Sequence, residues 1–325
     1  MKHNWKITIL ILSMFIATQI IGLYVVNYYS PAKVVNNVPI NVTTPNTLPY
    51  GLEPPPDNAQ VNVWQILLYI IPAFVIAIAL FFVLTRFKAA FVLKAWFFIV
   101  VIVALSTSLI AFFPSSALLF VLISLAISVP LAFFKIYRQN LWIHNITELF
   151  IYPGIAAVFV ALLSGADNSN RGVYAIMALL ILISIYDIWA VWHSGVMQKM
   201  AKYQINKLKI FGGFIIPSIS RGMRLKIKKM RKEKRKKEIR VNFAILGGGD
   251  VIFPIIAAGV VLRRFGFMNI LGLEVPLASI LVMIGAILGL GYLLLFGEKK
   301  KFYPAMPFIS TGIFLALGIC YLFLR

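Results

Sequence analysis

The chain has 325 residues, of which 61% are hydrophobic and 13% charged, and its formal net charge is +21. A mean hydropathy of +0.91 and so few charged residues exclude an ordinary soluble domain, in which roughly a quarter of the residues are charged. The composition predicts a polytopic membrane protein. We expect an all-α fold, because the apolar runs lack the alternation of a membrane β-barrel.

Nine apolar runs are long enough to cross roughly 30 Å of hydrocarbon as helices. In chain order they cover about residues 6 to 28, 63 to 84, 92 to 112, 116 to 134, 147 to 163, 173 to 193, 243 to 262, 277 to 296 and 305 to 324. The first run follows Lys2 and Lys6, as in a signal peptide, but its apolar stretch is longer than usual and no small-residue cleavage site follows directly. We therefore predict a bundle of nine transmembrane helices.

The basic residues are distributed unevenly over the predicted loops. If the N-terminus lies in the cytoplasm, most of the 31 Lys and Arg residues face the cytoplasm as well. The exceptions are Lys33, Arg171, Arg263, Arg264 and Arg325. Because cytoplasmic loops are enriched in Lys and Arg, we expect a multi-pass protein of the cell membrane with its N-terminus inside and its C-terminus outside.

A basic segment divides the chain into three parts. Residues 1–198 form a six-helix N-terminal part, residues 199–241 form a basic cytoplasmic loop, and residues 242–325 form a three-helix C-terminal part. The run from Lys226 to Arg240 could suggest nucleic-acid binding, but no aromatic residues are interleaved to stack on bases. Because such a loop attracts anionic lipid head groups, we expect the lipid bilayer, and no nucleic acid, as its partner.

Two acidic residues lie deep in the predicted helices, Asp187 and Asp250. A carboxylate at bilayer depth is costly and marks a functional site by default. Asp187 precedes Lys199 by roughly 18 Å of helix, and Asp250 follows Arg240 by roughly 15 Å. The two carboxylates therefore reach a similar level on antiparallel helices. Glu148, by contrast, is expected near the inner end of its helix, in reach of interfacial water.

If the two helices are neighbours, the two aspartates can work as a pair. Two carboxylates that meet in a low dielectric cannot both ionise, so the pair holds one proton. This is the working state of an aspartyl protease, in which the ionised partner takes a proton from water and the protonated partner polarises the amide carbonyl. Such chemistry requires no metal and no organic cofactor.

Two segments of the C-terminal part, one directly before Asp250 and one at the inner end of the last helix, fit a site at which another chain must approach the backbone closely. Gly247, Gly248 and Gly249 immediately precede Asp250, and glycines in a helix cost stability but allow a close approach of another chain. The segment Pro304-Ala305-Met306-Pro307 resists a regular helix. Tight helix packing and an ordinary helix start remain alternative interpretations of the two segments.

Together these motifs resemble those of the presenilin and signal peptide peptidase family of intramembrane aspartyl proteases, and the prokaryotic presenilin homologues in particular. Tyr186-Asp187, Gly247-Gly248-Gly249-Asp250 and Pro304-Ala305-Met306 correspond to the YD, GxGD and PAL motifs, with Met306 in place of leucine. The resemblance implies that Asp187 and Asp250 are catalytic. It also implies that the tyrosine, the glycines and the segment from Pro304 to Pro307 support the active site or engage substrate.

The resemblance further implies a peptidase that cleaves transmembrane helices of other proteins or peptides, with no obligate partner subunit. Other protease chemistries lack their residues: no H-E-x-x-H motif occurs, only His3, His144 and His193 are available, and His144 with Glu148 would make a weak metal site. The alternative is a proton- or cation-coupled transporter or channel that uses the same two aspartates.

Overall fold

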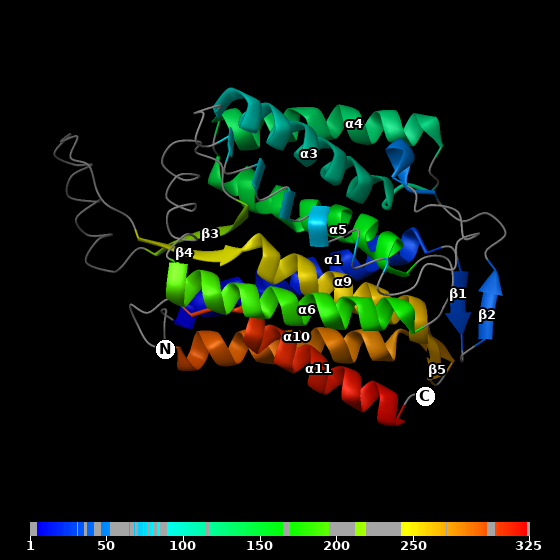
Figure 1. Cartoon of the computed structure of the whole chain (residues 1–325). Helices are drawn as coiled ribbons and strands as arrows, with labels where there is room; N and C mark the ends of the chain where they lie inside the picture. Colours follow the sequence, from blue (N-terminus) through cyan, green and yellow to red (C-terminus); the bar gives the residue numbers. More distant parts are fainter. Residues whose placement is uncertain are drawn as a thin grey trace.

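The computed structural model describes residues 5–30, 32–35, 38–41, 47–52, 90–114, 117–138, 140–164, 170–194, 212–218, 242–270, 272–297 and 303–323, together with helical positions scattered between 65 and 84. Its long helices are α1 (Trp5–Tyr28), α3 (Ala90–Ile110), α4 (Leu118–Phe133), α5 (Leu141–Ser164), α6 (Arg171–Trp189), α9 (Gly248–Phe265), α10 (Leu277–Phe296) and α11 (Met306–Phe323). As Figure 1 shows, they pack side by side into one bundle.

Among the described residues, three pairs of antiparallel strands, termed hairpins, lie at the ends of this bundle. They consist of β1 (Ala32–Val35) with β2 (Val38–Asn41), β3 (Gly213–Ser218) with β4 (Asn242–Gly247), and β5 (Met268–Ile270) with β6 (Leu273–Val275). A single 3-10 turn, Pro49–Gly51, and π-helical turns at Phe134–Arg138 and Ala190–Ser194 complete the described elements.

Seven of the described helices are long and apolar enough to span a membrane. Helix α9 has 18 residues but carries Asp250, Arg263 and Arg264, which lowers its apolar character. The predicted run from 63 to 84 lies largely outside the described residues. The prediction of a helical, polytopic bundle is therefore confirmed, whereas the number of nine spans stays a prediction.

The predicted boundary of the seventh run is wrong. Residues 242–247 form strand β4 rather than the first turns of a helix, and α9 begins only at Gly248. The physical reason is the glycine sequence itself, because glycine is a poor helix former and readily ends a strand. Helix α5 also begins at Leu141, six residues before the predicted start at residue 147, with His144 and Asn145 inside the helix.

Helices α1, α5 and α9 contact one another in pairs and form the centre of the bundle. Phe15 of α1 is fully buried, as are Val160 of α5 and Val261 of α9. Gly259 of α9 makes this packing possible, because a Cβ atom there would lie 2.7 Å from Val160 and 2.9 Å from Val26. The first apolar run is thus an integral part of the helical core.

Helices α10 and α11 pack through glycines on a line of small residues. A Cβ atom at Gly312 would overlap the Gly285 carbonyl group, and one at Gly289 would overlap the Phe308 carbonyl group. Small residues let membrane helices approach at backbone distance. This contact fixes the direction of α11 and with it the position of its first residue, Met306.

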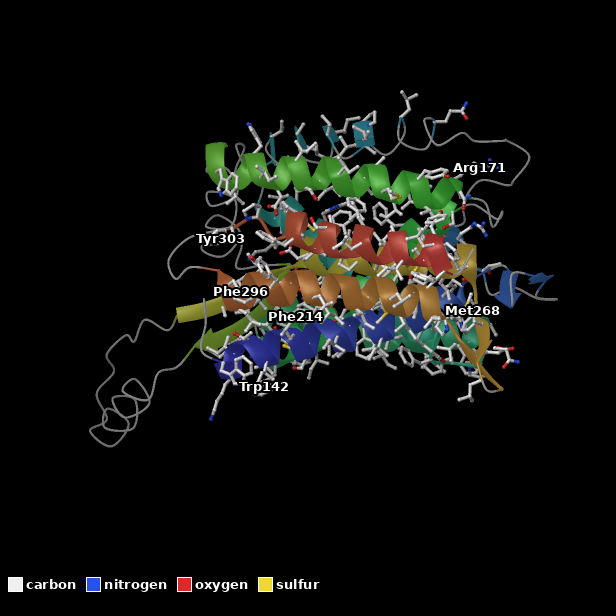
Figure 2. The ribbon with its side chains drawn as sticks, turned by 90° about the horizontal axis from the view of Figure 1, so that it is seen from below. Trp142, Arg171, Phe214, Met268, Phe296 and Tyr303 are labelled. Carbon is white, nitrogen blue, oxygen red and sulfur yellow. The ribbon has the colours of Figure 1, made fainter. Side chains whose placement is uncertain are left out.

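The two ends of the bundle carry different structures. Trp142, Phe214, Phe296 and Tyr303 lie at one end, and Arg171 and Met268 lie at the other (Figure 2). Hairpin β3–β4 belongs to the first end, and hairpins β1–β2 and β5–β6 belong to the second (Figure 1). Helix α1 starts at the first end and α11 finishes at the second (Figure 1), whereas the orientation of the chain in the membrane stays a prediction.

Candidate active site

Asp187 lies in the last turn of α6, with only 8% of its surface exposed. The backbone N–H of Met306 donates a hydrogen bond to its Oδ2 atom at 3.1 Å, and the Ala305 N–H is a second backbone donor. Met306 is the first residue of α11. Because the N-terminus of a helix carries unpaired N–H groups and a partial positive charge, the start of α11 is an anion site occupied by Asp187.

A second polar contact joins the same two helices. The Ser184 hydroxyl donates to the Ser310 hydroxyl at 3.0 Å. Ser184 lies three residues before Asp187 and Ser310 four residues after Met306, so each pair shares one helix face. Neither serine was predicted from the sequence, although polar residues at this spacing in apolar runs are a signal that could have identified them.

Asp250 lies in the first turn of α9, directly after the junction with β4. In the β3–β4 ladder, Gly213 pairs with Gly247, and the Gly248 N–H donates to the Gly212 carbonyl oxygen at 3.2 Å. The hairpin therefore continues to the first residue of α9. It holds Asp250 at a strand-to-helix junction, where the N-terminus of α9 favours a negative charge.

The three glycines before Asp250 have different surroundings. A Cβ atom at Gly247 would lie 3.1 Å from the Oδ2 atom of Asp250, and one at Gly248 would lie 3.0 Å from the Tyr152 ring. A Cβ atom at Gly249 would meet only Phe253, at an ordinary 3.7 Å. Gly247 thus keeps space free beside the carboxylate, and Gly248 admits the aromatic ring of Tyr152.

Helices α6, α9 and α11 contact one another in pairs. Helices α6 and α9 run in opposite directions (Figure 1), so that the end of α6 and the start of α9 lie at the same end of the bundle. The segment that precedes α11 also lies there, as the position of Tyr303 indicates (Figure 2). The fold thus brings the segments that carry the three motifs to one end of one helix triplet.

The remaining residues predicted for the site have separate positions. Tyr186 is 45% exposed, and its ring lies 6.3 Å from that of Trp189. Pro304 is buried just before α11, and Pro307 is the second residue of that helix. Proline is tolerated in the first turn because its missing N–H would be unpaired there. The two prolines therefore frame the N–H groups of Ala305 and Met306 that face Asp187.

The expectation for Glu148 is wrong. Its side chain is 2% exposed and forms an ion pair with buried Lys135, with 2.6 Å between Oε1 and Nζ. Lys135 also contacts Nδ1 of His144 at 3.2 Å. A charge in the bundle interior requires a partner, and the sequence does not reveal that Lys135 turns inward. Among the described residues, no three His, Cys, Asp or Glu side chains cluster as a metal site.

Comparison with known proteins extends the sequence resemblance. The family model described as signal-peptide peptidase, presenilin aspartyl protease matches residues 51–325. Two solved structures of a presenilin family intramembrane aspartate protease, in space groups C222 and P2, have similar folds. The C222 structure has a TM-score of 0.57 at 20% sequence identity, and the match covers 96% of this chain and 97% of that chain. The P2 structure has a TM-score of 0.55 at 19% identity, and the match covers 96% of each chain. No curated protein matches the chain significantly.

Proposed function

Because the chain belongs to the signal-peptide peptidase and presenilin aspartyl protease family, and is by that membership a multi-pass intramembrane aspartyl protease, we propose that Asp187 and Asp250 are its catalytic pair. The observation that carries the proposal is the buried Asp187 carboxylate, which accepts the Met306 N–H at the start of α11. This bond joins two of the three motif segments directly, and the third segment starts the neighbouring helix α9.

The proposed reaction is hydrolysis of a peptide bond by activated water. One aspartate is ionised and removes a proton from water as the water oxygen attacks the amide carbon. The other aspartate is protonated and donates a hydrogen bond to the carbonyl oxygen, which takes up negative charge. The tetrahedral intermediate then loses the amine, which takes a proton from the pair. A carboxylic acid and an amine are the products.

The proposed substrates are membrane-spanning helices of other proteins or peptides. A helix hides its amide groups, so cleavage requires local unwinding, and the extended strand then needs hydrogen-bond partners inside the bilayer. We propose that β4 supplies them, because it leads directly to Asp250 and because β3 is its only strand partner within the described part of the chain. Addition of a strand to a sheet edge is a common mode of peptide recognition.

The proposed membrane orientation and chain organisation are those that the sequence predicts. We propose that the N-terminus is cytoplasmic and the C-terminus external in the cell membrane, and that no obligate subunit is needed. In this proposal, residues 1–198 and 242–325 each supply one aspartate, and the basic loop 199–241, of which only residues 212–218 are described, joins them. The family and fold comparisons give no support to the transporter alternative.

The test uses the purified chain and a labelled single-span peptide. We expect products that mass spectrometry maps to bonds within the apolar segment, and competitive inhibition by a transition-state isostere of aspartyl proteases. Asp187→Asn and Asp250→Asn should each abolish cleavage and weaken isostere binding, while their thermal unfolding resembles that of the parent protein. Retained cleavage in either variant, or ion flux without peptide products, would overturn the proposal.

A further inference from the structure

A chain of buried polar contacts links α4, α5 and hairpin β3–β4. Lys135, in the π-helical turn that follows α4, donates to Glu148 at 2.6 Å and contacts His144 Nδ1 at 3.2 Å. The other ring nitrogen of His144, Nε2, lies 2.8 Å from the Gly213 carbonyl oxygen. Because a carbonyl oxygen can only accept, Nε2 carries the proton and Nδ1 accepts from the lysine ammonium group. The ion pair thus selects the tautomer of His144 that binds β3.

Asn145 makes a second, two-point contact with the same strand. Its amide nitrogen donates to the Ile215 carbonyl oxygen at 2.9 Å, and its amide oxygen accepts the Ile215 N–H at 3.0 Å. This side chain therefore satisfies both backbone groups of one strand residue, as a neighbouring strand would. Together, His144 and Asn145 bind Gly213 and Ile215, two residues apart on the outer edge of β3.

These contacts determine which backbone groups of the hairpin point outward. The Ile215 groups point toward α5, away from β4, so the pair Ile215 and Ile245 is of the type without mutual hydrogen bonds. On β4, the backbone groups of Ile245 therefore point away from β3, to the opposite edge. The same alternation applies to Gly247, opposite Gly213. The backbone groups of Ile245 and Gly247 therefore point to the outer edge of β4, and this edge leads to Asp250.

Tyr152 connects this anchor to the junction before α9. It is 3% exposed, its ring meets Phe214 of β3 edge-on at 5.7 Å between centroids, and it packs against Gly248. It lies one helical turn after Glu148 on α5, and it interacts electrostatically with both Glu148 and Asp250. Through Tyr152, one face of α5 therefore contacts both β3 and the glycine junction that precedes Asp250.

We propose that His144 and Asn145 are positioning residues of the protease: they fix the register and direction of hairpin β3–β4 on α5. They thereby align with Asp250 the outer edge of β4, which pairs with no other strand among the described residues. Lys135 and Glu148 act through His144. The inference rests on the proposed function. An isolated two-stranded hairpin is marginally stable at best, so this one requires an external anchor. The anchor also occupies the outer edge of β3, which leaves the β4 edge for an extended substrate.

The test compares variants of the full-length chain. Asn145→Leu removes both contacts with Ile215 at similar volume, and His144→Leu removes the contact with Gly213. His144→Gln keeps an amide donor near the position of Nε2 and should restore part of the function. Thr147→Val is the matched control. Thr147 is buried one turn along the same helix, and its hydroxyl has the helix carbonyl of His144 as its sole partner among the residues that the structure describes.

The measurements are amide hydrogen exchange in residues 213–218 and 242–247, the kinetics of peptide cleavage, and the positions of the cleaved bonds. We expect Asn145→Leu and His144→Leu to raise exchange in both strands, to lower kcat/KM at least tenfold, and to distribute cleavage over neighbouring bonds. His144→Gln should lie between His144→Leu and the parent. Thr147→Val should retain the parent's exchange, rate and cleavage positions.

Unchanged hairpin exchange in Asn145→Leu would overturn the inference, as would raised exchange with the parent's rate and cleavage positions. If Asn145→Leu does not fold, the contrast between His144→Gln and His144→Leu decides in the same way. An inactive parent protein would instead overturn the proposed function, whereas hydrogen exchange would still decide whether α5 anchors the hairpin.

Discussion

The contact between Met306 and Asp187 can be tested by removing a single backbone donor. Met306 is the first residue of α11, a position at which proline fits because no intrahelical bond uses its N–H. Met306→Pro should therefore delete the 3.1 Å hydrogen bond to Asp187 and leave the hydrogen bonds within the helix intact. The Ala305 N–H remains as a donor.

The expected loss follows from the chemistry of this bond. A hydrogen bond to a charged group contributes about 1.5 to 3 kcal/mol, and 1.4 kcal/mol corresponds to about a factor of ten in rate. If the bond holds the carboxylate in its reactive orientation, kcat should fall roughly 10- to 150-fold. The assay is cleavage of a single-span peptide by purified protein at saturating substrate, with binding of a transition-state isostere as a second readout.

Two further variants separate the donor from the side chain, which is 3% exposed. Met306→Ala loses most of the apolar contact but keeps the N–H, and Met306→Leu keeps both the N–H and the volume. We expect Met306→Leu to retain the parent's activity, because volume-conserving apolar exchanges cost little. Met306→Ala should lie well above Met306→Pro in kcat. Equal rates for the alanine and proline variants would refute the role of the N–H group.

Three other predictions concern the bundle. Gly312→Leu should lower the thermal unfolding temperature in detergent by several degrees or prevent folding, because a Cβ atom at this position would overlap the Gly285 carbonyl group. Gly318→Leu is the control: a Cβ atom there meets no described atom within 4 Å, so this variant should unfold like the parent. Gln19→Leu should change the unfolding free energy by less than about 1 kcal/mol. It removes the hydrogen bond from Nε2 to the Val251 carbonyl oxygen, but it also removes a buried Oε1 atom that has no hydrogen-bond partner in the described structure. A loss of stability above about 3 kcal/mol would contradict this balance. Cys320, with no exposed surface, should react with a maleimide only after denaturation, and rapid labelling of the folded protein would show that α11 packs differently.

The helices and the two acidic residues could be predicted from the sequence because both signals are local. An apolar run of sufficient length has few alternatives to a membrane helix, and a carboxylate within such a run is conspicuous. A similar depth for Asp187 and Asp250 was expected from counting residues to the flanking charges, and the depth itself stays a prediction. Their arrival at one end of the bundle agrees with the antiparallel course of α6 and α9.

The partners of the polar groups could not be predicted, because they depend on which helix faces which. Glu148 was expected at the interface, yet Lys135 folds inward to pair with it. Arg263 and Arg264 were expected outside as exceptions to the charge rule. That side of the membrane stays a prediction, but the partner of Arg263 was not foreseen: its guanidinium is buried and donates to the Tyr29 carbonyl oxygen, just after α1. Each of these contacts joins residues of different elements, and a single sequence carries no signal for such pairs.

The location of the glycines changes the interpretation of the site. Within a helix, three consecutive glycines would only weaken it, by roughly 1 kcal/mol each relative to alanine. At the junction of β4 and α9 they let a strand end where a helix begins, which places Asp250 at a helix N-terminus. Asp187 lies at the opposite, C-terminal end of its own helix, where the dipole disfavours a negative charge. The start of α11 supplies the missing donors. Both carboxylates therefore lie at the N-terminus of a helix, Asp250 at that of its own helix and Asp187 at that of a neighbour. In the proposed active site, the proline-framed start of α11 thus has a definite role, because it supplies the donors that the helix of Asp187 lacks.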